Sequence, residues 1–127
     1  MNDWTFFTKK ELECRGTGEC AMNVEFMDKL VNLRKKYNRP MVISSGYRSL
    51  AHNSSINGAR YSPHLYGRAV DVLCYGKSAY DLIKLAMNMG MTGIGLQQRG
   101  KHEGRFVHLD DMPRSEDHQR PWIWTYK

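Results

Sequence analysis

Apolar and polar residues alternate along this chain with two distinct periods, and the longer period predicts two amphipathic helices. Between residues 24 and 37, apolar side chains return at steps of three and four, as on the buried face of a helix. Asn23 can cap the start of this helix, and Pro40 lies just beyond its end. A second helix is predicted over residues 78–89, because it opens on a Ser-x-x-acid capping pattern and stops at Gly90.

Short runs of apolar and β-branched residues, bounded by turn-forming residues, predict the strands. They cover residues 41–44, 68–73, 93–96 and 105–110, with a last strand or an extended tail over 121–126. We also expect a helical turn within 9–13 and another within 51–56, in the long polar connection 45–67. Such connections often carry function. Together these elements predict an α+β fold, with two main helices packed on a small, mostly antiparallel sheet.

Length and composition fit one globular domain over residues 1–127. Hydrophobic residues make up 41% of the chain and charged residues 25%, which excludes disorder throughout. No run approaches the ~18 apolar residues of a membrane-spanning helix, so we expect no membrane span. The start of the chain has neither a basic segment nor an apolar one, so we expect no secretory signal and synthesis in the cytoplasm.

The charge balance is basic, with 19 lysines and arginines against 13 acidic residues, or +6. A basic surface favours anionic partners such as nucleic acid, anionic lipid or the polymers of a bacterial cell wall. The sequence has no zinc-finger, aromatic RNA-binding or basic-zipper pattern, so we expect no nucleic-acid partner. Cys14, Cys20 and Cys74 form no disulfide framework; a bridge between the first two and free thiols both stay open.

Two imidazoles and one carboxylate are the strongest candidates for chemistry. His64 lies in a turn before a strand, Asp71 lies among apolar residues of that strand, and His108 lies among apolar residues of a later one. A carboxylate in an apolar strand is costly unless it is paired or binds a metal. These three residues form a ligand set for zinc that leaves a fourth position for water, as in catalytic sites. Taken singly, each also fits a structural role, as a core histidine or a turn-bonded aspartate.

The segment from Ser62 to Asp71 resembles the Ser-x-His-x-x-Gly-x-Ala-x-Asp signature of the zinc D-alanyl-D-alanine peptidases, with every fixed position present. This family includes peptidoglycan carboxypeptidases, vancomycin-resistance dipeptidases and phage endolysins that cut L-alanyl-D-glutamate bonds, and it shares its fold with hedgehog signalling domains. Its Ser-Gly-Tyr-Arg-Ser element is matched at residues 45–49 and its late His-x-Asp element at 108–110. Residues 7–14 are similar to the N-terminal segment of the small members.

The resemblance implies a monomeric, zinc-dependent peptidase that hydrolyses peptidoglycan stem peptides, of the D-Ala-D-Ala carboxypeptidase or the L-Ala-D-Glu endopeptidase type. His64, Asp71 and His108 would bind Zn2+, which lowers the pKa of its water and polarises the scissile carbonyl. Arg48 would face the carbonyl oxygen or a substrate carboxylate. Ser62 would hold a loop, cap a turn or donate to the substrate. The missing secretory signal suits a phage lysin that reaches the cell wall or periplasm through a membrane pore.

The general base is the one departure from the family pattern. Many relatives carry an acidic residue three positions before the last zinc histidine, but here that position is Arg105, which cannot accept a proton. We expect Asp110 to replace it, because on a strand Asp110 shares a face with His108, and Glu103 is the second candidate. If neither carboxylate reaches the metal water, the protein is a zinc-holding module that binds cell-wall peptide or a protein partner without cleaving it.

Overall fold

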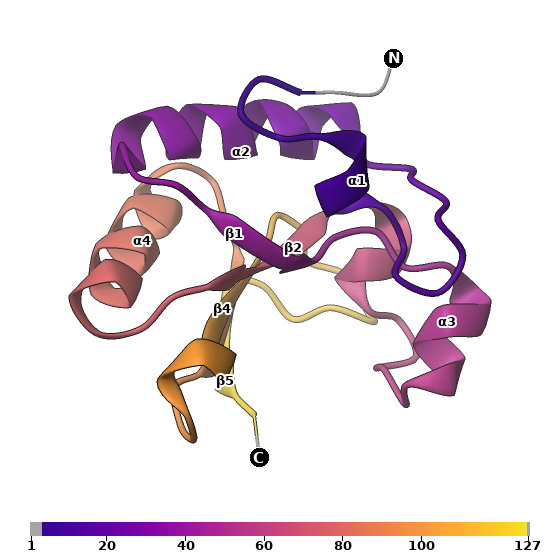
Figure 1. Ribbon diagram of the computed structural model, residues 1–127. Coiled ribbons are helices and arrows are strands. Elements are labelled where there is room, and N and C mark those ends of the chain that lie inside the picture. The colour runs from indigo at the N-terminus through magenta and orange to yellow at the C-terminus, as the bar shows by residue number, and fades with distance from the viewer. Residues whose placement is uncertain (1–3, 127) are drawn as a thin grey trace.

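The computed structural model describes residues 4–126 and shows an α+β fold built on one five-stranded sheet (Figure 1). The strands are β1 (Val42–Ser45), β2 (Ala69–Leu73), β3 (Gly93–Gln97), β4 (Phe106–Asp110) and β5 (Trp122–Thr125), in the spatial order β1-β2-β4-β3-β5. Neighbouring strands are antiparallel except β5, which runs parallel to β3. The predicted fold class is confirmed, with a mixed sheet in which antiparallel pairs dominate.

The four α-helices lie where helices or helical turns were predicted, although α4 begins earlier than expected. They are α1 (Lys9–Leu12), α2 (Val24–Tyr37), α3 (Leu50–Ser55) and α4 (Gly76–Asn88), with two short 3-10 helices, η1 (Pro63–Tyr66) and η2 (His102–Gly104). The Asn23 side chain accepts a hydrogen bond from the backbone N–H of Phe26 at 2.9 Å, which confirms the predicted cap of α2. Asn38 ends that helix in the left-handed conformation, with φ of 54°.

The predicted start of α4 is wrong. The helix begins at Gly76, two residues before Ser78, and the residue that precedes it provides no side-chain cap. Asp81 does not close a capping box, because its carboxylate pairs with Lys77 at 2.8 Å and with Arg39. A carboxylate held by two cations on the outer face of the helix is not available to the backbone N–H groups at its start.

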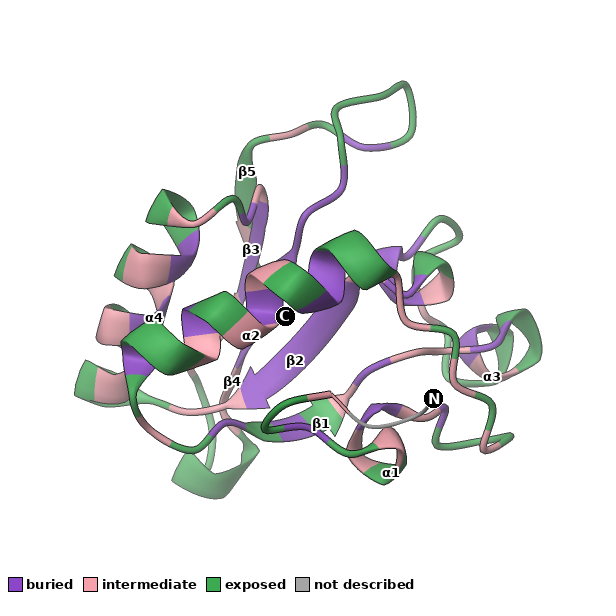
Figure 2. Ribbon diagram, turned by 90° about the horizontal axis from the view of Figure 1, so that it is seen from above, coloured by how far each residue is buried: buried purple, intermediate pink, exposed green. Residues whose placement is uncertain are grey.

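The apolar core lies between α2, α4 and one face of the sheet. The buried face of α2 carries Phe26, Met27, Leu30 and Leu33, and Figure 2 shows this helix lying across the buried strand β2. Each such side chain contributes about 1.5–3 kcal/mol when it leaves water. The described helices include none long and apolar enough to cross a bilayer, and the three cysteines are free thiols.

The pairing of β2 with β4 separates the two faces of the sheet. Val70 is opposite Leu109 and Val72 is opposite Val107, and all four side chains are in the core. Side chains of a strand alternate between its two faces. The residue pair between them, Asp71 and His108, therefore faces away from the core and meets across the two strands.

Candidate metal centre

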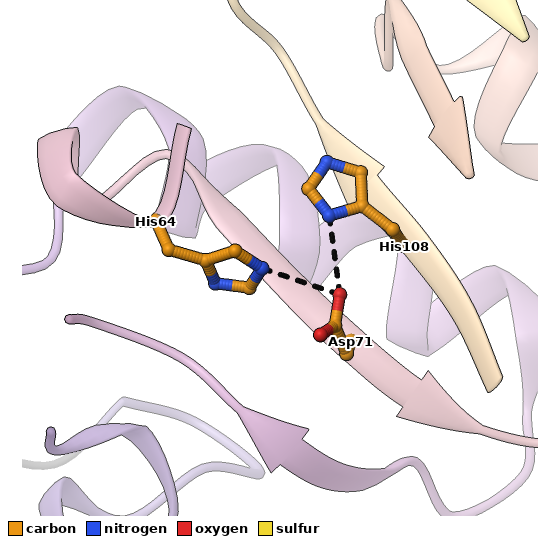
Figure 3. Close-up of side chains that lie close together, drawn as sticks. All are labelled: His64, Asp71 and His108. Atoms are coloured by element: carbon orange, nitrogen blue, oxygen red, sulfur yellow. Dashed lines mark hydrogen bonds and ion pairs between the residues drawn. The ribbon is translucent and has the colours of Figure 1, made fainter. Parts of the chain in front are cut away.

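His64, Asp71 and His108 converge at one point on the sheet face opposite the core (Figure 3). The Nε2 atom of His64 lies 3.2 Å from Oδ1 of Asp71, and the Nδ1 atom of His108 lies 3.1 Å from the same oxygen. The candidate ligand atoms all lie within 4.8 Å of one another. All three residues are buried, although they come from η1, β2 and β4. The convergence expected from the sequence is confirmed.

The turn that presents His64 is fixed by its two ends. The Ser62 hydroxyl accepts a hydrogen bond from the His64 backbone N–H at 3.3 Å, and Pro63 occupies the first position of η1. Gly67 ends the turn with φ of 66°, and a Cβ atom there would overlap the backbone carbonyl of Ala21. Only glycine satisfies both conditions, so the chain can turn directly from η1 into β2.

Each imidazole is oriented by a hydrogen bond on the ring nitrogen that faces away from the centre. Nδ1–H of His64 donates to the carbonyl oxygen of Gly46 at 2.7 Å. Nε2–H of His108 donates to Oδ2 of Asp110 at 2.7 Å. These bonds leave the other nitrogen of each ring with a free lone pair, and both lone pairs point toward Asp71. Outer partners of this kind are typical of histidines that bind metals.

The donor set fits a divalent cation. Two imidazole lone pairs and a carboxylate oxygen face one another, and none of the three atoms brings a hydrogen to share. Only a cation, either a proton or a metal ion, relieves the repulsion among them. Two neutral imidazoles and one carboxylate match the preference of zinc for nitrogen and oxygen ligands, and they would provide three of the four ligands that zinc usually takes.

Burial and mutual contact shift the pKa values of the three residues in different directions. Burial lowers the pKa of His64, and the Asp71 charge only partly opposes this. Burial also acts to lower the pKa of His108, but the Asp110 and Asp71 carboxylates favour its protonated form more strongly and raise the pKa. Burial acts to raise the pKa of Asp71, yet the two imidazoles hold it well below its usual range. Asp71 is therefore an ionised carboxylate at neutral pH, as a metal ligand must be.

A cleft of about 590 Å³ gives access to this centre. It is lined by the loop 56–63, by the aromatic residues Phe106, Trp124 and Tyr126, and by Asp117, His118 and Arg120. A ligand that enters the cleft meets Asp71 and both histidines, so the site is a lined cavity rather than a closed structural centre.

Arg48 and Ser62 both line the cleft, as the sequence led us to expect. The Arg48 guanidinium lies 3.8 Å from Oδ2 of Asp71 and donates to the side-chain oxygen of Asn53 at 3.2 Å. Asn53 is itself buried and donates to the backbone carbonyl of Ala59 at 2.9 Å. The guanidinium is thus held beside Asp71, one of the three candidate metal ligands.

The two residues expected to serve as general base lie elsewhere. Asp110 is 0% exposed, and its carboxylate is behind the His108 ring, on the side away from Asp71. Glu103 is exposed on η2 and is absent from the residues that line the cleft. Arg105 donates to the carbonyl of Gly100 at 2.9 Å, outside the cleft lining. The geometry therefore supports neither carboxylate as the base.

Three residues near the centre were missed in the sequence. Arg120 binds Asp110, Trp124 packs against His108 with ring centroids 5.0 Å apart, and Asp117 lines the cleft. All follow β4 in a segment with no recognisable motif, and they reach the site because β5 pairs with β3. No local pattern in the sequence specifies this long-range pairing.

The three candidate metal ligands lie within the part of the chain that is similar to known proteins. The family model of peptidase M15 matches residues 5–110 of this chain. The zinc D-Ala-D-Ala carboxypeptidase of Streptomyces albus G is 36% identical over 56 residues, which cover 44% of this chain and 22% of that protein. The peptidoglycan L,D-endopeptidase MepK of Escherichia coli K12 is 31% identical over 80 residues, which cover 59% of this chain and 42% of that protein. The matches span less than half the length of either relative.

Proposed function

The chain belongs to the peptidase M15 family, and from that premise we propose that it is a zinc-dependent peptidase that hydrolyses stem peptides of peptidoglycan. The observation that carries the proposal is the convergence of His64, Asp71 and His108 at the base of an open cleft. The names of the two relatives, a zinc carboxypeptidase and a peptidoglycan endopeptidase, support the metal and the substrate.

The residues around the cleft have separate roles in this proposal. Zinc, when bound, supplies a Lewis acid and lowers the pKa of a water molecule to about 7. His64, Asp71 and His108 hold it through the atoms that face one another. Arg48 presents a fixed positive charge where a carbonyl oxygen gains negative charge during attack, and this is the usual use of such a donor. Ser62 keeps the turn of His64 in place by capping it.

Hydrolysis also requires a residue that accepts a proton from the attacking water molecule. A general base must come within about 3 Å of the attacking water, directly or through another water. Among the residues that the structure describes, the cleft lining holds two carboxylates, those of Asp71 and Asp117. Because Asp71 is assigned to the metal, we propose Asp117 as the acceptor. Its neighbour His118 is anchored through a 2.6 Å hydrogen bond to the carbonyl of Tyr61, which fixes the backbone beside Asp117.

A second candidate function is a zinc-holding module that binds stem peptides without cleaving them. The observation that favours it is the position of Asp110 and Glu103, because neither of the residues expected to act as base lines the cleft. Both candidates place the protein at the cell wall, where its charge of +6 suits an anionic polymer. The relatives are bacterial proteins and lend no support to the phage lysin expected from the sequence.

The test is incubation of the purified protein with peptidoglycan, with and without a chelator, followed by mass spectrometry of the released peptides. We expect cleavage that stops on chelation and returns with zinc. Loss of terminal D-alanine would identify a carboxypeptidase, and a new amino terminus within the stem would identify an endopeptidase. Cleavage should be absent in His64→Ala and unchanged in the control His102→Ala, whose ring stacks on Tyr75 at the surface.

Two further variants separate the candidate functions. Asp117→Asn should reduce the rate strongly without weakening zinc binding, whereas Glu103→Gln should leave both unchanged. Stoichiometric zinc and measurable peptide binding with no cleavage by the wild-type protein would establish the binding module instead. A protein that binds no zinc would contradict both candidates.

A further inference from the structure

Arg120 forms a two-pronged ion pair with Asp110 beneath the metal centre. Its Nε–H donates to Oδ1 at 3.0 Å and its Nη2–H donates to Oδ2 at 2.9 Å. The Arg120 side chain is only 8% exposed and that of Asp110 is not exposed at all. Paired guanidinium–carboxylate bonds of this kind fix both position and orientation.

The carboxylate held by Arg120 is the one that orients His108. Its Oδ2 atom accepts from Nε2–H of His108 at 2.7 Å, and its Oδ1 atom also accepts from the backbone N–H of Met112 at 3.1 Å. Opposite, Gly93 leaves the space that the carboxylate occupies, since a Cβ atom there would lie 2.5 Å from Cγ of Asp110. Asp110 thus has one available position, and His108 takes its ring orientation from it.

Arg120 borders the cleft, but its guanidinium is directed toward these protein partners. Its third nitrogen donates to the backbone carbonyl of Gln119 at 2.8 Å, so all three nitrogens have partners within the protein. The guanidinium carbon lies 5.3 Å from the ring centroid of Trp124, which in turn packs against His108. Arg120 therefore supports His108 from two directions without reaching its metal-facing nitrogen.

We propose that Arg120 is a positioning residue of the metal centre, which acts through Asp110 to hold His108 in its metal-binding orientation. The inference rests on the proposed function, because it supposes a metal at His64, Asp71 and His108. Arg120 lies beyond residues 5–110, the part of the chain that the family model matches. The segment after β4 therefore completes the centre rather than merely extending the fold.

The experiment measures the zinc dissociation constant of purified variants by competition with a coloured chelator. Arg120→Met should weaken zinc binding about 10- to 100-fold, the usual effect of losing an outer partner of a metal-bound histidine. Arg120→Lys, which restores the charge but not the two-pronged geometry, should recover part of that loss. Arg114→Met is the matched control, because Arg114 is exposed on the same segment and should leave the constant unchanged.

A double-mutant cycle separates positioning from a general loss of structure. Asp110→Asn should weaken zinc binding by a similar factor, and adding Arg120→Met to it should cause little further loss, because Arg120 acts through Asp110. The visible spectrum of the Co2+-loaded protein gives a second readout, which should change in Arg120→Met as the His108 ligand reorients. Melting curves of the metal-free variants show whether each one folds; if Arg120→Met does not, Arg120→Lys carries the test.

The outcomes separate the inference from the proposed function. Wild-type affinity for zinc in a folded Arg120 variant would overturn the inference while leaving the metal site intact. Equal and additive losses from Arg120→Met and Asp110→Asn would overturn it as well, since the two residues would then act independently. Failure of the wild-type protein to bind zinc would instead contradict the proposed function.

Discussion

Gly93→Ala is the sharpest test of how the metal centre is built. Gly93 on β3 pairs with Asp110 on β4, and a Cβ atom at this position would overlap the Asp110 carboxyl group, with Cγ at 2.5 Å. Carbon atoms in ordinary contact lie about 3.5–4.0 Å apart, so the carboxyl group must move by about 1 Å or more. Such a displacement strains the four bonds of 2.7–3.1 Å that Asp110 makes to His108, Arg120 and Met112, and we expect two of them to break.

The size of the effect follows from those bonds. A hydrogen bond to a charged group contributes about 1.5–3 kcal/mol, so losing two of them costs about 3–6 kcal/mol. Alanine in place of glycine returns about 0.5–1 kcal/mol through the lower entropy of the unfolded chain. We therefore expect the free energy of unfolding of the metal-free protein to fall by about 2–5 kcal/mol, and zinc binding to weaken as well.

The assay is urea denaturation followed by tryptophan fluorescence, together with a zinc competition titration on the folded variant. Gly104→Ala is the matched control, because a Cβ atom there meets nothing within 4 Å and the change should stay within about 0.5 kcal/mol. A Gly93→Ala protein with wild-type stability and wild-type zinc affinity would refute the reasoning, because the Asp110 carboxylate would then tolerate a Cβ atom at position 93.

Three further predictions concern the metal, pH and the core. Chelation should lower the melting temperature of the wild-type protein but not of His64→Ala, because a ligand that binds only the folded state stabilises it. Burial acts to raise the pKa of Asp110, but its bonds to His108 and Arg120 outweigh this and lower it from 3.8 to about 2. The metal-free protein should therefore hold this stabilisation above about pH 4 and lose it as the pH falls toward 2, whereas Asp110→Asn should show a shallower decline in urea midpoint between pH 4 and 2. Phe26→Ala should lower the free energy of unfolding by about 3–5 kcal/mol in urea denaturation, while the control Phe6→Ala, at a half-exposed position, should cost under about 1 kcal/mol.

The local parts of the structure were predictable because their causes are local. The cap at Asn23, the end of α2 and the strand carrying Asp71 all follow from residues within one turn or one strand. The start of α4 was mispredicted because Asp81 pairs with Lys77 and with Arg39, and Arg39, 42 positions away, also donates to the Ser78 hydroxyl. A capping pattern at a helix start does not form when its acidic side chain is already paired with cations.

The candidate site was predictable only in part, for the same reason. His64, Asp71 and His108 were identified because the signature residues lie close in the sequence or repeat a known spacing. The alternation rule placed Asp110 on the same face as His108, which is correct, but it does not say which side of the imidazole the carboxylate occupies. That choice depends on Arg120, which reaches Asp110 through the pairing of β5 with β3.

The alternation of valines and candidate metal ligands on β2 and β4 ties the assembly of the centre to the assembly of the core. If β2 slid by one residue against β4, Asp71 would enter the hydrocarbon interior and both Val70 and Val72 would leave it. A misaligned chain would thus lose its reactive groups and its hydrophobic stabilisation in a single error. Correctly folded molecules are for that reason the ones in which His108 already lies within reach of the Asp71 carboxylate.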